Sequence, residues 1–321
     1  MCAPGQQEDA TAEWDAARAW VEETLGRRGR VTRVDPLRGG WTSRMRRLVV
    51  SDADGTRTVV LRSLVRPFFA RHAEGLLTRE ARTLRLLAGT DVPAPLSLGF
   101  DAGAARCVHP SSLMTWLPGR LRLEQAGHGR RVPALARELA RLHAVRVPEE
   151  RRPRVYQAWT SAERVVAPTT GRPDLWARAV AAIRREPPGY RGRLLHRDFH
   201  PGNVLFAGEG AALSVSGVVD WVETSWGPAD LDVAHCATAL ALLHGPDTGM
   251  RFADAYVSAG GELEREPGAH LYWRLLDALA YAPYAEKVAG PWRECGRNDL
   301  TPGVLAARLE DYLGLLLRRY G

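Results

Sequence analysis

The chain has 321 residues, of which 45% are hydrophobic and 25% are charged, as is typical of a globular protein with a substantial core. This length allows two domains, or one domain with two lobes. The net charge of +7 is unevenly spread: residues 118–216 hold 18 basic and 9 acidic groups, and residues 217–321 hold 9 basic and 15 acidic groups. The sequence therefore does not predict a uniform basic surface for nucleic acid, and its acidic C-terminal third would favour a cationic ligand.

The cysteines and the apolar runs exclude several classes of protein. The four cysteines show no paired spacing, so we expect neither disulfides nor a zinc framework. No run approaches the roughly 18 apolar residues of a membrane span, and the most apolar run, 233–243, predicts a buried helix. The first residues are acidic and lack the apolar segment of a secretory signal. We expect a cytoplasmic protein with no membrane partner.

The first half of the chain alternates between helical and strand patterns. Apolar spacing predicts helices at 12–25 and 75–88. Runs rich in β-branched and apolar residues predict five strands, and the sequence Asp52-Ala53-Asp54-Gly55 predicts a hairpin between the second and third. The predicted strands are 30–37, 45–51, 58–64, 96–100 and 107–114.

Helical patterns dominate after Leu117-Pro118-Gly119, where we place the boundary between two lobes. We predict a β-rich N-terminal lobe at 1–117 and a larger helical lobe at 118–321, hence an α+β fold with a ligand cleft between the lobes. A two-strand insert, ending near residues 195 and 220, interrupts the helices. The predicted helices are 132–145, 174–185, those beginning at 230, 250 and 270, and 303–320.

The insert carries the densest set of polar residues, in the sequence His196-Arg197-Asp198-Phe199-His200-Pro201-Gly202-Asn203. Asp198 follows an apolar run and is suited to orient a hydroxyl and accept its proton. Asn203 and Asp220 supply the oxygen ligands that magnesium prefers. The simplest alternative is that Asp198 only caps its own loop. A zinc hydrolase built on His196, Asp198 and His200 is a second alternative, which lacks a further His or Cys nearby in the sequence.

The segments LLHRDFHPGNVLF and GVVDWVETSWGPADLDVAH resemble the aminoglycoside phosphotransferase family, whose kinase-like fold is shared with choline kinases. The resemblance runs in order along most of the chain. It implies that Asp198 is the catalytic base and that Asn203 and Asp220 bind Mg²⁺. It also implies that Asp232 braces the catalytic loop, and we expect His196 to do the same.

The resemblance further implies a nucleotide site, for ATP or GTP, in the N-terminal lobe. Arg62 replaces the strand lysine that binds phosphates in the family, and Glu80 would pair with it. The backbone at Gly39 and Gly40 would approach phosphates, with Thr42 or Ser43 donating hydrogen bonds, although a plain hairpin turn fits equally. Residues 114–117 would form the hinge, with Met114 and Trp116 beside a purine.

The acceptor pocket is the least determined part of the site. Four residues are candidates for it: His200, Glu223, Asp277 and Glu286. We expect a phosphotransferase that moves the γ-phosphate of a nucleotide to a hydroxyl of an antibiotic, an aminoglycoside or similar polycation. Choline, a sugar, an amino alcohol or a macrolide are alternative acceptors, and a silent nucleotide-binding module is an alternative from another class. The segment 221–229 is too short for the activation loop of a protein kinase, and the sequence leaves open whether the protein is a monomer or a homodimer.

Overall fold

The structure is a computed structural model that describes residues 4–26, 29–37 and 43–321, with the backbone alone at 4–10. Two compact units make up the chain. The first is Met1–Gly89 with Ala94–Leu117, and the second is Thr90–Pro93 with Pro118–Gly321. The binding of nucleotide by the first unit and of acceptor by the second stays a prediction.

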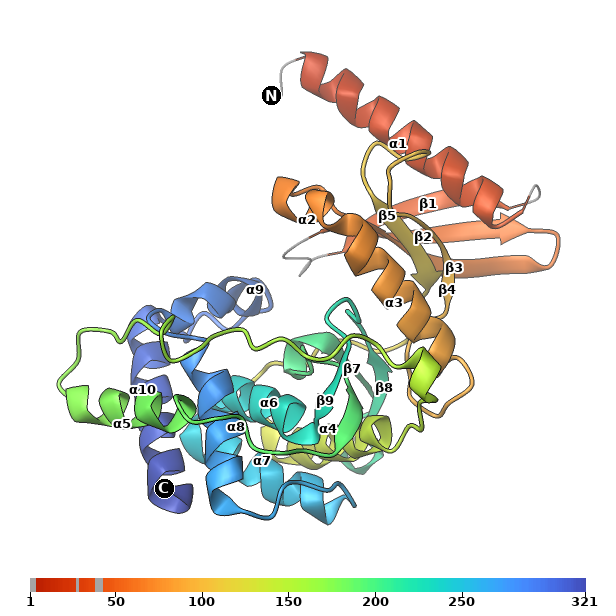
Figure 1. The fold of residues 1–321 in the computed structure, drawn as a ribbon. Helices are drawn as coiled ribbons and strands as arrows, with labels where there is room; N and C mark the ends of the chain where they lie inside the picture. Colours follow the sequence, from red (N-terminus) through yellow and green to blue (C-terminus); the bar gives the residue numbers. More distant parts are fainter. Residues whose placement is uncertain (1–3, 27–28, 38–42) are drawn as a thin grey trace. The chain divides into compact units, whose positions relative to one another are not determined.

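The first unit is built on a five-stranded antiparallel sheet in the order β1-β2-β3-β5-β4 (Figure 1). The hairpin of β2 and β3 closes where Asp52 pairs with Gly55, at the predicted turn. The elements of this unit are α1 (Pro4–Thr24), β1 (Arg30–Leu37), β2 (Arg44–Asp52), β3 (Gly55–Ser63), α2 (Pro67–Arg71), α3 (Ala73–Leu87), β4 (Ser97–Asp101) and β5 (Ser111–Thr115).

The strand β3 has different partners on its two faces because successive side chains of a strand point to opposite sides of the sheet. Val59 and Leu61 are buried in a cluster with Trp20 and Val21 of α1. Arg62 therefore points to the other face, where it meets α3. The alternation of side chains along β3 thus places Val59 and Leu61 in the core and Arg62 beside α3.

The second unit is mainly helical and contains two short antiparallel sheets, β6 with β9 and β7 with β8. Its strands and short helices are β6 (Gly192–Leu195), β7 (Val204–Ala207), β8 (Ser214–Val218), β9 (Ser225–Pro228), η1 (Glu149–Arg151), η2 (Pro201–Asn203), η3 (Gly210–Ala212) and η4 (Ala285–Val288). Its helices are α4 (His128–His143), α5 (Pro173–Ile183), α6 (Ala229–His244), α7 (Pro246–Ser258), α8 (Pro267–Leu279), α9 (Ala289–Glu294) and α10 (Pro302–Tyr320).

Helix α6 forms the centre of the second unit. Every residue of α6 is buried, which confirms the buried helix predicted at 233–243. It packs against α7, α8 and α10, and Figure 1 shows α6 beside α8. A helix without a solvent face can bring polar side chains to a buried site only if each one finds a partner. In the described part of the chain, no helix has the length and apolar character that a membrane crossing requires.

Some elements begin elsewhere than predicted, for identifiable reasons. The strand predicted from Cys107 begins only at Ser111 because the carboxylate of Asp101 accepts the backbone N–H groups of 105–107 at 2.8–2.9 Å and folds them into a turn. Helices α7 and α8 begin earlier than predicted, at Pro246 and Pro267, where proline occupies the first helical position. The strand β9 was missed because its four residues, SWGP, carry no alternating pattern.

Candidate active site

The segment 196–203 connects β6 to β7 and carries most of the predicted site. Its companion is the end of β8, because β7 and β8 pair from Val204 opposite Val218. The backbone N–H of Val219 donates to the carbonyl of Asn203 at 3.0 Å, so Asp220 follows directly after a residue bonded to Asn203. Two segments that are separate in the sequence thus meet at one end of this hairpin.

His196 links these two segments through one hydrogen bond to each. It is fully buried, its Nδ1 accepts the backbone N–H of Asp198 at 3.2 Å, and its Nε2 lies 3.1 Å from the carbonyl of Val219. A carbonyl can only accept, so the ring is neutral with its proton on Nε2. Burial lowers the pKa of His196, although the nearby carboxylates of Asp232 and Asp198 oppose the shift.

Asp232, in the first turn of α6, holds the backbone before Asp198. Its carboxylate accepts the N–H of His196 at 2.7 Å and that of Arg197 at 2.8 Å. Arg197 has φ 73°, a left-handed conformation that is unfavourable for a side chain this large, and the bond to Asp232 stabilises it. Burial raises the pKa of Asp232, but the hydrogen bond and charge of His143 outweigh it and lower the pKa overall.

Asp198 lies at the centre of a set of hydrogen bonds but remains accessible, with 33% of its side chain exposed. Its Oδ2 accepts a hydrogen bond from Nδ2 of Asn203 at 2.9 Å, and its Oδ1 accepts one from Nε2 of His235 at 3.1 Å. Burial would raise the pKa of Asp198, but the positive potential of His200 and the bond from His235 hold it well below its usual range. An ionised, oriented and accessible carboxylate is what a group that accepts a hydroxyl proton requires.

His200 approaches the same carboxylate, with its Nε2 3.6 Å from Oδ1 of Asp198. Its Nδ1 accepts the backbone N–H of Gly202 at 3.0 Å, so the proton of the neutral ring is on Nε2. Burial lowers the pKa of His200 to about 4. Position 202 requires glycine because a Cβ there would lie 2.6 Å from Cε1 of His200.

Asp198, His200 and His235 each offer a ligand atom within 4.8 Å of the others, so the structure supplies the extra histidine that a zinc site would need. The hydrogen bonds oppose such a site. A histidine binds a metal through an unprotonated nitrogen, whereas Nε2 of His200 carries a proton while Nδ1 accepts from Gly202. His235 faces a carboxylate at each nitrogen, which favours protons on both. The zinc alternative therefore does not fit these contacts.

Asn203 and Asp220 suit a hard cation instead. The Nδ2 of Asn203 donates both to the carbonyl and to Oδ2 of Asp198, each at 2.9 Å, which turns its Oδ1 away from Asp198. Asp220 lies just beyond β8 with φ 68°. An amide oxygen and a carboxylate are oxygen donors of the kind that Mg²⁺ prefers. The donor set thus fits Mg²⁺.

In the first unit, the predicted pair of Arg62 on β3 and Glu80 on α3 is in contact. Nη1 of Arg62 lies 3.0 Å from Oε1 of Glu80, and the two side chains are 5% and 3% exposed. The hydroxyl of Ser112 approaches Oε2 of Glu80 at 3.5 Å. This buried ion pair restricts the orientation of the guanidinium.

The other predicted nucleotide residues are only partly described. Gly39, Gly40 and Thr42 lie outside the described residues, and Ser43 is buried just before β2. Met114 is buried on β5, opposite Val60. Trp116 follows β5 and stacks under the guanidinium of Arg47, 5.1 Å from the ring centre.

The acids predicted for the acceptor pocket have other partners. Glu223 pairs with Arg154 at 2.8 Å, and Glu286 pairs with Arg293. Asp277 is only 1% exposed and accepts the Nδ1 of His235 at 3.0 Å. Our expectation for Asp277 needs correction: its carboxylate is buried beneath His235, where an acceptor cannot touch it.

His235 is the residue that sequence reasoning missed. It lies on α6 three residues after Asp232, so helical spacing places both on the same face, and this was the available signal. We expected the run around it to form a buried helix and assigned His235 no role. What the spacing could not indicate was the partner, since Asp277 is 42 residues away on α8.

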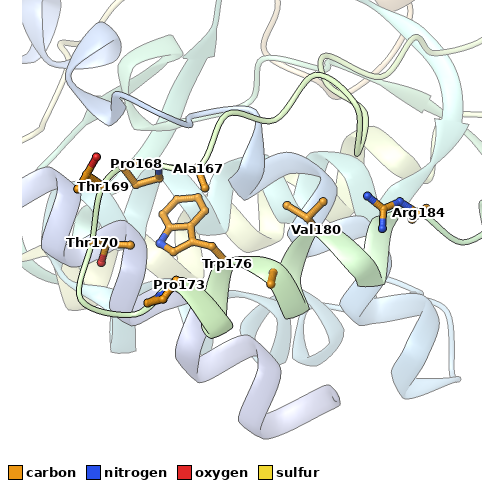
Figure 2. Close-up of a pocket in the computed structure, with 9 residues that line it drawn as sticks. Ala167, Pro168, Thr169, Thr170, Pro173, Trp176, Val180 and Arg184 are labelled. Atoms are coloured by element: carbon orange, nitrogen blue, oxygen red, sulfur yellow. The ribbon is translucent and has the colours of Figure 1, made fainter.

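The second unit has several cavities. One of about 470 Å³ lies along α5, where Trp176 and Val180 line it with Ala167 and Arg184, and no predicted site residue is among its lining residues (Figure 2). Another, of about 210 Å³, adjoins the catalytic segment. It is lined by Arg154, Gln157, Ala158, Trp159, Arg164, Arg197, Glu223 and Ser225.

Several solved structures resemble the chain. The aminoglycoside phosphotransferase APH(4)-Ia is 14% identical with a TM-score of 0.59, covering 95% of this chain and 98% of that one. The aminoglycoside phosphotransferase APH(3'')-Id from Streptomyces rimosus is 19% identical with a TM-score of 0.53, covering 84% and 98%. The amicoumacin kinase hAmiN, in complex with AMP-PNP, Ca²⁺ and Ami, is 13% identical with a TM-score of 0.57, covering 98% and 96%.

At these identities the likeness establishes the fold, which confirms the two-lobed, kinase-like α+β architecture predicted from the sequence. No curated protein matches the chain at a significant level. A profile of the phosphotransferase enzyme family matches residues 33–272, about three quarters of the sequence. The chain belongs to the phosphotransferase enzyme family.

Proposed function

We propose that this phosphotransferase transfers the γ-phosphoryl group of ATP or GTP to a hydroxyl of a small antibiotic, with Asp198 as the base and Mg²⁺ held by Asn203 and Asp220. The observation that carries the proposal is the environment of Asp198. Its two carboxylate oxygens are fixed by Asn203 and His235, while a third of the side chain stays exposed. That arrangement supports a group that orients an incoming hydroxyl and accepts its proton.

In the proposed reaction, the acceptor hydroxyl donates its hydrogen bond to the exposed side of the Asp198 carboxylate. The bond between the acceptor oxygen and phosphorus forms as the bond to the departing nucleoside diphosphate breaks, and the proton passes to Asp198. Bound Mg²⁺ would neutralise phosphate charge. Positioning and electrostatics supply most of the rate, so the rigid backbone at 196–203 is the main contribution of the fold.

The proposed contribution of the first unit is to bind phosphate through Arg62. Its ion pair with Glu80 is nearly fully buried, which supports a fixed orientation. An arginine keeps its charge at all physiological pH values and donates through several N–H groups, so it can replace a lysine as a phosphate ligand.

The acceptor we propose is an aminoglycoside or a similar polycation. The excess of acids in residues 217–321 supports it, and two structurally similar proteins are aminoglycoside phosphotransferases. A less cationic acceptor is the second candidate, because three arginines and one glutamate line the cavity beside the catalytic segment. Amicoumacin kinase, with the same fold, shows that acceptors vary among these proteins.

The test is a coupled nucleotide-turnover screen with ATP and GTP across aminoglycosides, macrolides, choline, sugars and amino alcohols. We expect Mg²⁺-dependent turnover with at least one acceptor. Asp198→Asn should lower kcat by about 100-fold or more, the usual contribution of general-base catalysis. The control is Asp247→Asn, an exposed aspartate of α7. Equal turnover by Asp198→Asn and wild type would overturn the assignment.

A nucleotide-binding module without turnover makes the opposite prediction. Such a module would bind nucleotide, consume none with any acceptor, and be indifferent to Asp198→Asn. Isothermal titration with a non-hydrolysable ATP analogue would separate the two, since binding without turnover across the whole screen favours the module.

A further inference from the structure

We propose that His235 is a positioning residue for Asp198: its imidazole, anchored by the buried carboxylate of Asp277, bridges the two carboxylates and fixes Oδ1 of Asp198 for the incoming hydroxyl. The proposal deepens the proposed function and rests on it. It assigns roles to two residues, on α6 and α8, that lie 37 and 79 positions beyond Asp198.

The bridge is defined by two hydrogen bonds, one at each ring nitrogen. Nδ1 lies 3.0 Å from Oδ1 of Asp277, and Nε2 lies 3.1 Å from Oδ1 of Asp198. Ionised carboxylates accept hydrogen bonds and cannot donate them. A ring placed between two of them satisfies both contacts only when both nitrogens carry protons, as a cation.

The surroundings favour this cation. Burial alone would lower the pKa of His235, but the charges of Asp277 and Asp198 raise it to about 9. The other ionisable groups near the bridge include Asp232 and Cys236 on the same helix, His200 on the catalytic segment, and Tyr281, over whose ring Lys287 lies. Arg197 lies over the ring of Trp159, which packs against His235. His200 accepts a hydrogen bond at Nδ1 and is neutral, so it does not compete as a cation.

Asp277 depends on the same ring. Its side chain is 1% exposed, and its Oδ2 has no hydrogen-bond partner among the described residues. The imidazolium is thus the group that compensates this buried charge, since a buried carboxylate without a partner is strongly unfavourable. Among the described residues, hydrogen bonds connect Asp277 to Asp198 through His235.

Two aromatic side chains pack against the ring of His235. Trp159 meets it edge-on at 4.8 Å between ring centres, and Tyr281 stacks near it at 6.3 Å. Because both nitrogens are occupied, His235 cannot take the proton of the acceptor itself. It orients the carboxylate that does, and the proton leaves through the exposed side of Asp198.

The chain offers a matched control between the same two helices. His270 on α8 lies 3.4 Å from Asp230 on α6, a second His–Asp contact that does not involve Asp198. His270→Gln removes such a contact without touching the carboxylate of Asp198, so we expect it to leave kcat within twofold of wild type.

The kinetic experiment compares His235→Gln, Asp277→Asn and the double variant, using ATP, Mg²⁺ and kanamycin, or the first acceptor turned over in the screen. We expect kcat to fall at least tenfold in each single variant while the KM for ATP changes less than twofold. The kcat of the double variant should be no lower than that of His235→Gln, because Asp277 acts through His235. Wild-type kcat in the folded single variants, or losses that multiply in the double variant, would overturn the proposal.

Chemical rescue separates positioning from packing. In His235→Ala, added imidazole should restore part of kcat because its cation can donate at both nitrogens. 1-Methylimidazole fills similar space but its cation has a single N–H, so it should restore little. Equal rescue by the two compounds would indicate a packing role and contradict the bridge.

A measurement on the wild-type protein covers the case in which the variants do not fold. Nitrogen-15 NMR of labelled histidine at pH 7.5 should show both ring nitrogens of His235 protonated, assigned by comparison with His270→Gln and the other His variants. An unprotonated nitrogen in His235 would overturn the bridge. If wild type turns over no acceptor, the proposed function fails, and the NMR result still decides whether the bridge exists.

Discussion

Three histidines surround Asp198, and their hydrogen-bond partners give His196 and His200 one protonation pattern and His235 another. His196 donates to a carbonyl through Nε2 and accepts at Nδ1, and His200 likewise accepts at Nδ1. His235 faces carboxylates at both nitrogens. The same residue type therefore serves as a loop brace, a neutral neighbour and a cation. The sequence alone could not distinguish them, because the distinction depends on which groups lie opposite each ring nitrogen.

Asn203 has two separable roles, as a hydrogen-bond donor to Asp198 and as a proposed metal ligand. Asn203→Asp keeps an oxygen ligand but loses the Nδ2 donor, and it puts a second carboxylate where the amide lies 2.9 Å from Oδ2 of Asp198. We expect kcat to fall at least tenfold, while the Mg²⁺ concentration for half-maximal activity stays the same or decreases. Mg²⁺ titrations of steady-state turnover measure both quantities.

The other asparagine of the chain, the exposed Asn298, provides the control through Asn298→Asp. A variant Asn203→Asp with unchanged kcat would show that donation to Asp198 is dispensable. A large rise in the Mg²⁺ requirement would instead show that the position does not bind the metal through its side-chain oxygen.

At the scale of the elements, sequence patterns predicted the features that depend on interactions between residues close together in the sequence. The apolar spacing of α3 and α10, the hairpin at Asp52–Gly55 and the buried character of α6 were readable in the sequence. The dense polar segment 196–203 was readable for the same reason. The bond between His235 and Asp277 was not, because the packing of α8 against α6 determines it.

Helix α4 carries a buried carboxylate whose ionisation opposes folding. Glu138 is almost fully buried, accepts Nη1 of Arg141 at 2.9 Å through Oε2, and has no hydrogen-bond partner at Oε1 in the described structure. Burial raises the pKa of Glu138 to about 7, against the weaker opposing effect of Arg141. The folded state therefore holds this proton more tightly than the unfolded state, and its contribution to stability is lost as the pH rises from about 4.5 through about 7.

Glu138→Gln removes this ionisation while keeping an oxygen that can accept from Arg141. We expect the variant to be more stable than wild type at pH 8, by on the order of 3 kcal/mol at 1.36 kcal/mol per pKa unit, with the gain shrinking toward pH 5. Thermal unfolding at both pH values measures it. Glu150→Gln, at an exposed position, should change the Tm at neither pH. A gain at pH 5 as large as that at pH 8 would contradict the titration of Glu138.

On the scale of the whole molecule, the acidic excess of residues 217–321 is partly neutralised by arginines. Ion pairs join Glu223 to Arg154, Asp254 to Arg319 and Asp311 to Arg172. The composition alone therefore overstated the negative charge available to a ligand. What remains is long-range attraction, which depends on ionic strength.

A polycationic acceptor should consequently bind less well in salt. Between about 0.1 M and 1 M salt the Debye length falls from about 10 Å to about 3 Å. We expect the KM of an aminoglycoside acceptor to rise several-fold over this range, and kcat to change less than twofold. Steady-state kinetics in KCl would measure this, with a neutral acceptor from the screen as the reference. An aminoglycoside KM independent of salt would favour the less cationic acceptor.

Phosphorus-31 NMR of the reaction mixture tests the central claim most directly, because it observes the transferred group itself. With nucleotide, Mg²⁺ and an acceptor from the screen, wild type should produce a new phosphomonoester resonance together with the nucleoside diphosphate. Asp198→Asn should produce neither at a comparable rate, while Asp247→Asn should match wild type. Release of inorganic phosphate alone, or the same phosphomonoester from Asp198→Asn at the wild-type rate, would contradict the account.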